Sequence, residues 1–194
     1  MLSKFGLILM GAIASLALAA PAFAQTVTFE QREEADGSTT LVHEILVPAP
    51  PADVWEAIST PQGWTTWAVP LAWTDPAATD FMETAYDPGA EIGDPGNIRQ
   101  QILEQVPGST FVFRTVKAPE GFPHAATYYR VTSEFALSLQ DGDTLVRLTT
   151  RGYAPGEAGA QLVGFFTEGN AVSLGDLYRR FSVGPKDWAA SAAE

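Results

Sequence analysis

One long helical stripe, placed after a series of strands, is the feature that most constrains the fold of this chain. The stripe recurs at steps of three and four over about five turns and consists of Val163, Phe166, Asn170, Leu174, Leu177 and Phe181. Gly184-Pro185 is predicted to end this helix. Because a single long helix must cover the apolar face of a whole sheet, we expect the sheet to curl around it.

The region before this helix is predicted to form an antiparallel sheet. Turn-forming separators, such as Asp94-Pro95-Gly96 and Asp141-Gly142-Asp143, divide it into segments rich in β-branched and aromatic residues. Short separators between successive strands imply antiparallel neighbours, and the first two segments suggest a hairpin. The expected strands are 26–32, 40–47, 81–86, 97–104, 110–117, 127–139 and 144–153.

Residues 49–67, between the hairpin and the later strands, are predicted to form two short helices. Val54 and Ile58 lie at helical spacing after a proline-rich strand end, and Thr60-Pro61 opens a second helical turn. Trp64 and Trp67 then lie three residues apart on one side. We expect these two tryptophans to cover one end of the space between sheet and long helix.

This segment carries a family resemblance through the pattern Ala52-x-Val54-Trp55-x-Ala57-Ile58-Ser59-Thr60-Pro61-x-Gly63-Trp64-x-x-Trp67. The pattern resembles the START-related helix-grip superfamily (SRPBCC), and more narrowly its AHSA-like branch, which is similar to the C-terminal domain of a heat-shock ATPase activator. The resemblance covers residues 26–181. It implies an α+β helix-grip fold, in which a curved antiparallel sheet wraps around a long C-terminal helix and two short helices follow the first strands. Members of the superfamily typically bind apolar small molecules in the sheet–helix cavity, and some are cyclases or other enzymes.

The first 24 residues have the pattern of a secretory signal peptide. A short region with Lys4 precedes an apolar run that is too short to span a membrane, and Ala22-Phe23-Ala24 forms a small-x-small cleavage site. We therefore expect a signal peptide over 1–24, one START-like domain over 25–183 and a C-terminal tail over 184–194. A periplasmic location without stable membrane insertion follows from this pattern.

Charge and cysteine content exclude several classes of function. The formal net charge of −12 makes nucleic acid an unsuitable partner, because phosphate backbones repel an acidic protein. The chain has no cysteine, which excludes disulfides, thiolate catalysis and cysteine zinc sites. No cofactor and no metal site is predicted.

The candidate ligand-binding residues are mostly aromatic: Trp64, Trp67, Met82, Tyr86, Phe111, Phe113, Tyr129, Phe135, Phe166 and Asn170. Asn170 is unusual, because a buried amide without partners costs about 1–3 kcal/mol. It could bond to the sheet or a buried water, or it could orient a polar group of a ligand. Gly164, Gly169 and Gly175 in the same helix either permit close packing or leave room for a guest.

Few side chains are suited to catalysis. His43 and His124 could titrate near neutral pH, and neither belongs to a metal-ligand or nucleophile motif. His43, in a strand, is expected to be structural or solvated. His124, after a proline-rich loop, is the catalytic candidate because it could lie at a cavity mouth, and Glu83 and Glu134 could be buried acids.

Three functions therefore remain open. The leading hypothesis is a carrier, sequestering protein or sensor for a small hydrophobic molecule. The second is a cyclase- or hydrolase-type enzyme that uses His124 or a buried glutamate. The third is an interaction module with a filled core. Phe165 and Val172 lie opposite the main stripe of the long helix. They either rest under a loop or form an exposed patch, which would permit a homodimer.

Overall fold

A computed structural model describes residues 26–191 of the chain. The predicted signal peptide lies outside the described residues. Within them, eight strands form one antiparallel sheet in the order β1-β2-β8-β7-β6-β5-β4-β3. The strands are β1 (Thr28–Glu33), β2 (Thr39–Val47), β3 (Leu71–Trp73), β4 (Phe81–Ala85), β5 (Ile98–Val106), β6 (Thr110–Lys117), β7 (Thr132–Gln140) and β8 (Asp143–Tyr153).

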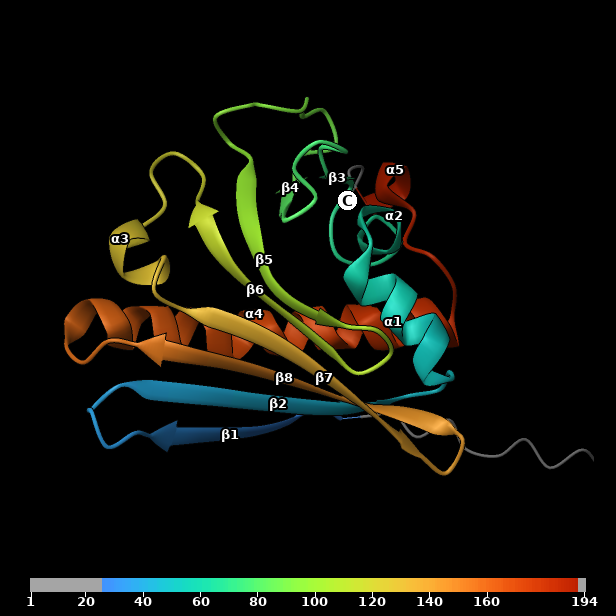
Figure 1. Ribbon diagram of the computed structural model, residues 1–194, viewed down its shortest axis with the longest axis horizontal. Coiled ribbons are helices and arrows are strands. Elements are labelled where there is room, and N and C mark those ends of the chain that lie inside the picture. The colour runs from blue at the N-terminus through green and yellow to red at the C-terminus, as the bar shows by residue number, and fades with distance from the viewer. Residues whose placement is uncertain (1–25, 192–194) are drawn as a thin grey trace, which may run out of the picture.

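Five helices accompany the sheet: α1 (Pro51–Ser59), α2 (Pro61–Trp64), α3 (Ala125–Tyr128), α4 (Glu157–Ser182) and α5 (Trp188–Ser191). Figure 1 shows the strands changing direction strongly from β1 to β5, with α4 extended along the concave side and α1 and α2 at one end. Helix α4 packs mainly on β2 and β8. The predicted helix-grip fold is therefore confirmed. No described helix is long and apolar enough to span a membrane.

Two clusters of buried hydrophobic side chains form the core. The large cluster lies among α1, α2, the sheet and the C-terminal half of α4, and includes Trp64, Trp67, Phe111, Phe113, Phe135, Leu174 and Leu177. The small cluster lies near α3 and the N-terminal half of α4, and includes Leu41, Val131, Tyr153 and Leu162, with Tyr128 and Phe166 packed against it. The predicted stripe of α4 thus contacts both clusters.

The predicted strand 127–139 was wrong in its first part, because residues 125–128 form α3 and the strand begins at Thr132. His124 adopts a left-handed conformation with φ of 57°, and its carbonyl accepts hydrogen bonds from the amides of Thr127 and Tyr128. The Tyr128 ring then packs on Phe166 with the ring centroids 4.8 Å apart. This tertiary contact outweighs the strand preference of the aromatic residues.

The segment after α4 bonds back onto the α2 region. The amide of Lys186 donates to the carbonyl of Thr66, and Trp188 Nε1 donates to the carbonyl of Thr65 at 2.7 Å. The expected tail therefore includes α5 and forms a wall beside the C-terminal half of α4.

Candidate functional site

The two tryptophans predicted to cover the interior anchor α1 and α2 to the sheet. Trp64 Nε1 donates to the carbonyl of Ile58 at 2.6 Å, and Trp67 Nε1 donates to the carbonyl of Ala57 at 2.9 Å. The Trp67 ring meets Phe135 edge-on, with the centroids 6.4 Å apart. Both indoles are buried with their polar atoms satisfied, so they hold the first helices in place.

The other predicted ligand-binding residues lie in different surroundings. Met82, Phe111, Phe113 and Phe135 are buried in the large cluster together with the two tryptophans. Tyr129 follows α3, and its hydroxyl accepts a hydrogen bond from the amide of Ala118. Tyr86 is 69% exposed, whereas Phe166 and Asn170 face the sheet from α4. The role of all ten residues as ligand contacts stays a prediction.

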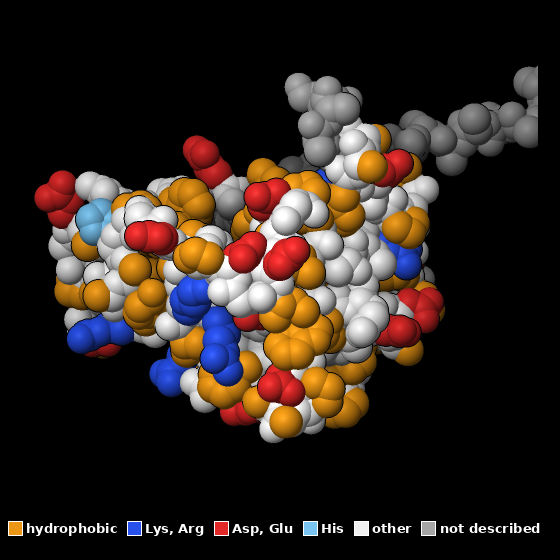
Figure 2. Space-filling view, turned by 90° about the horizontal axis from the view of Figure 1, so that it is seen from above, with side chains coloured by type: hydrophobic (Ala, Val, Ile, Leu, Met, Phe, Trp, Pro, Cys, Tyr) orange, Lys and Arg blue, Asp and Glu red, His pale blue; other side chains and the backbone are white. Residues whose placement is uncertain are grey.

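An apolar groove of about 440 Å³ lies beside α4. We call it the α4 groove; its apolar lining consists of Ala68, Tyr86, Phe165, Gly169, Val172 and Trp188. Phe165 and Val172 are 59% and 66% exposed, so of the two expected alternatives the exposed apolar patch is the one found on this side of the helix. Figure 2 likewise shows hydrophobic side chains gathered in patches between charged ones on one face of the molecule.

The glycines of α4 leave open space. A Cβ atom built on Gly164, Gly169 or Gly175 would meet no atom within 4 Å outside the helix's own neighbouring backbone. Close packing against another element therefore does not explain them. Gly169 lines the α4 groove, where a side chain would occupy part of its volume.

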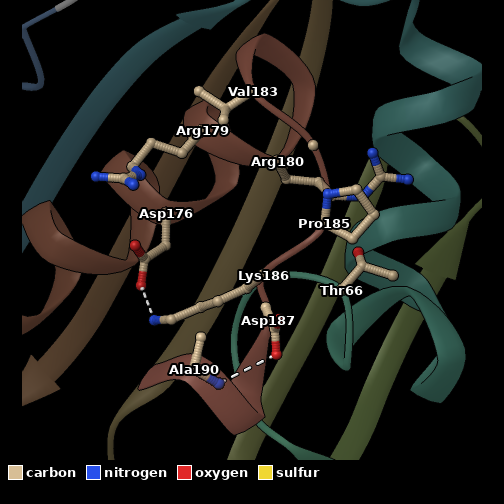
Figure 3. Close-up of a pocket in the computed structure, with 10 residues that line it drawn as sticks. Thr66, Asp176, Arg179, Arg180, Val183, Pro185, Lys186, Asp187 and Ala190 are labelled. Atoms are coloured by element: carbon tan, nitrogen blue, oxygen red, sulfur yellow. Dashed lines mark hydrogen bonds and ion pairs between the residues drawn. The ribbon is translucent and has the colours of Figure 1, made fainter. Parts of the chain in front are cut away.

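A second pocket, of about 520 Å³, adjoins the groove and is more polar. Asp176 and Lys186 line both pockets, and they form an ion pair with an N–O distance of 2.9 Å between them (Figure 3). Figure 3 also shows that the guanidinium groups of Arg179 and Arg180 point to opposite sides. These two cations do not converge on a common point, so the arrangement does not form an anion site.

A band of polar side chains separates the two hydrophobic clusters inside the fold. The polar band consists of His43, Thr84, Gln100, Thr115, Ser133 and Thr150 on the sheet and of Asn170 on α4. Gln100 pairs with Thr115 and Ser133 pairs with Thr150 across adjacent strands; the other sheet members are diagonal neighbours. The polar band therefore crosses six strands without interruption.

Hydrogen bonds satisfy one half of the polar band. Asn170 Nδ2 donates to Thr150 Oγ1 at 3.2 Å, and the Tyr153 hydroxyl donates to the same oxygen at 3.0 Å. Thr115 Oγ1 donates to the Tyr128 hydroxyl at 2.9 Å. Burial raises the pKa of Tyr128 to about 12 and also raises the pKa of Tyr153. Both phenols are therefore neutral at physiological pH.

The other half of the polar band has unpaired atoms. Thr84 Oγ1, Gln100 Oε1 and His43 Nδ1 are buried without a hydrogen-bond partner among the described residues. An unpaired buried polar atom destabilises the folded state by about 1–3 kcal/mol, so the presence of each one requires an explanation. Of the polar band, sequence reasoning singled out Asn170 and His43 but none of the threonines, the serine or the glutamine. A threonine or glutamine in one strand is unremarkable until the strand register shows its neighbours.

His43 lies at one end of the polar band, and its Nε2 donates to the carbonyl of Thr167 in α4 at 3.0 Å. Burial lowers the pKa of His43 below its usual value, although the bond to Thr167 acts in the opposite direction. His43 was expected to be either structural or solvated. Its side chain is fully buried, so the structural role is the correct one.

We expect the free energy of unfolding to decrease as the pH falls below about 6.5, the usual histidine pKa. In this range the unfolded chain binds a proton at His43 that the folded chain resists, so acid favours unfolding. Urea denaturation between pH 7.5 and 5.5 measures this slope. His43→Gln should flatten it, whereas His124→Gln should retain it; an equal slope in the wild type and His43→Gln would contradict the assignment.

The catalytic candidates lie away from the polar band. His124 is half-buried at the start of α3, where its Nε2 donates to Gln161 Oε1 at 2.7 Å. Glu83 accepts a hydrogen bond from Asn97 Nδ2, and Glu134 pairs with Arg151 on the outer face. The described residues contain no group of histidine and acidic side chains that could hold a metal ion.

Several solved structures have the same fold as this chain. The Aha1 dimer from Colwellia psychrerythraea is 16% identical and matches with a TM-score of 0.58, covering 75% of this chain and 97% of that one. Protein MLL2253 from Mesorhizobium loti is 20% identical, with a TM-score of 0.57 and coverage of 72% and 94%. CalU16 from Micromonospora echinospora is 19% identical, with a TM-score of 0.56 and coverage of 85% and 88%.

Residues 38–180 match the family described as polyketide cyclase / dehydrase and lipid transport, and the chain belongs to this family. The match confirms the START-related superfamily, and the likeness to Aha1 supports the AHSA-like comparison at the level of fold. Comparison with curated proteins gives no match.

Proposed function

We propose that this protein binds a small, predominantly apolar molecule between its sheet and C-terminal helix, with the α4 groove as the entrance. The observation that carries the proposal is the groove itself, about 440 Å³ lined by exposed Tyr86, Phe165 and Val172 and by half-buried Trp188. Ligand pockets typically have volumes of about 300–1,000 Å³ and mostly apolar walls. A family described in part by lipid transport supports the same function.

The biological role that fits is that of an exported carrier, sequestering protein or sensor. The signal-peptide pattern of the first 24 residues supports a periplasmic location. The placement of His124, Glu83 and Glu134 away from the polar band favours binding over the cyclase- or hydrolase-type alternative.

We expect the hydrocarbon probe diphenylhexatriene to bind the wild type and to bind Gly169→Trp at least tenfold more weakly. The indole would occupy the groove, and a tenfold loss corresponds to about 1.4 kcal/mol. Gly164→Trp is the matched control, because it lies in the same helix with equally open surroundings and outside the groove. Probe fluorescence measures the affinity, and native mass spectrometry of freshly purified protein tests for a bound guest. A wild type that binds no probe, or equal affinities for both variants, would contradict the proposal.

Self-association through Phe165 and Val172 is the second candidate, favoured by the exposure of both side chains on one side of α4. The similar Aha1 structure is that of a dimer. Sedimentation velocity over a range of concentrations decides between the two functions, since a monomer throughout would exclude a homodimer of this chain.

A further inference from the structure

The unpaired half of the polar band points to the chemistry of the ligand. We propose that Thr84 and Gln100 recognise a hydrogen-bond donor on the ligand, and that the preferred ligand is an uncharged amphiphile such as a long-chain alcohol. This inference rests on the ligand binding proposed above and adds the class of polar group that the site selects.

The polar band and the α4 groove are linked by neighbouring positions in β4 and α4. Tyr86, in the groove, follows Thr84 by two residues at the end of β4, and Gly169 in the groove precedes Asn170. A ligand with its apolar part in the groove would therefore direct its head toward the polar band.

A hydrogen-bond donor on the ligand would satisfy the unpaired oxygen atoms of Thr84 and Gln100. Gln100 Oε1 can only accept a hydrogen bond, and Thr84 Oγ1 is buried beside it on the neighbouring strand without a partner. A ligand hydroxyl can donate to one of these acceptors and accept from the threonine, which an alkyl chain cannot do.

The surroundings select against a charged head. All members of the polar band other than His43 are uncharged by nature, and burial lowers the pKa of His43, so it is neutral at pH 8. Lys186 at the groove is paired with Asp176, and Glu168 adds a negative charge to the same rim. A carboxylate in the polar band would be buried without a counter-ion, which is strongly unfavourable.

The test compares two ligands of equal chain length, 1-dodecanol and dodecanoate, as competitors of diphenylhexatriene at pH 8. Dodecanol is kept below its solubility limit and dodecanoate below its critical micelle concentration. We expect dodecanol to displace the probe at a concentration at least tenfold lower than dodecanoate. Displacement by dodecanoate at an equal or lower concentration would overturn the inference.

Two substitutions of similar size test the named residues. Gln100→Leu and Thr84→Val should each weaken dodecanol binding about two- to tenfold, the value of one hydrogen bond, and leave the affinity for diphenylhexatriene unchanged. Gln101→Leu is the matched control, because Gln101 is the next residue and pairs with Arg114 on the other face of the sheet. The melting temperatures of Gln100→Leu and Thr84→Val should not fall, since each change removes an unpaired buried atom.

The outcomes separate the two proposals. If the wild type binds no diphenylhexatriene, ligand binding itself is refuted. If the probe binds and the variants bind dodecanol as the wild type does, buried water satisfies the polar band and only the present inference is refuted.

Discussion

Replacing Trp67 with alanine is expected to lower the free energy of unfolding by about 3–5 kcal/mol, the usual cost of removing a buried tryptophan from a core. The side chain is 2% exposed and packs against Trp64 and Phe135. Its Nε1 donates to the carbonyl of Ala57 in α1, so the substitution also leaves a buried carbonyl without this donor. Urea denaturation followed by circular dichroism measures the change.

Trp73→Ala is the matched control for this substitution. Trp73 lies in the short strand β3 at the edge of the sheet and is 36% exposed, so we expect a markedly smaller loss of stability. If both substitutions had the same effect, the anchoring role of Trp67 would be excluded.

Replacing Gly63 with alanine is expected to destabilise the protein by about 1–3 kcal/mol, as overpacking of a tight core does. A Cβ atom at this position would collide with the carbonyl oxygen of Glu56 and the backbone of Ala57. These are backbone atoms of α1, which can yield only if α1 and α2 separate. Thermal and urea denaturation both report the loss.

Gly164→Ala is the matched control on α4, and it should have the opposite sign. Its Cβ atom would enter open space, so the higher helix propensity of alanine should stabilise the protein by up to about 1 kcal/mol. Destabilisation by Gly164→Ala, or tolerance of Gly63→Ala, would show that the packing around these glycines differs from the one described.

The fold could be predicted from the sequence because its main signals are local. The helical stripe from Val163 to Phe181 and the turn residues between strands depend only on nearby positions in the chain. The misplaced start of β7 has the opposite cause, since Tyr128 turns into α3 to pack against Phe166 on a distant helix. Strand β3 has three residues, too few for a periodic pattern.

The candidate site was less accessible to prediction because it depends on contacts between distant residues. Asn170 was recognised because it interrupts an apolar helical stripe. Thr84 and Gln100 interrupt no such stripe, and they become diagonal neighbours only through the register of β4 against β5. Trp188 could not be assigned to the groove from its position in the sequence, because a bond to Thr65 brings it there.

The position of Trp188 has a consequence for how this architecture can diversify. One wall of the groove comes from a short segment after α4 that is attached to the α2 region by the bonds of Lys186 and Trp188. The two core clusters include neither residue. Substitutions in this segment can therefore reshape the groove while the sheet and its helix keep their packing, so the shape of the proposed ligand entrance and folding stability can evolve almost independently.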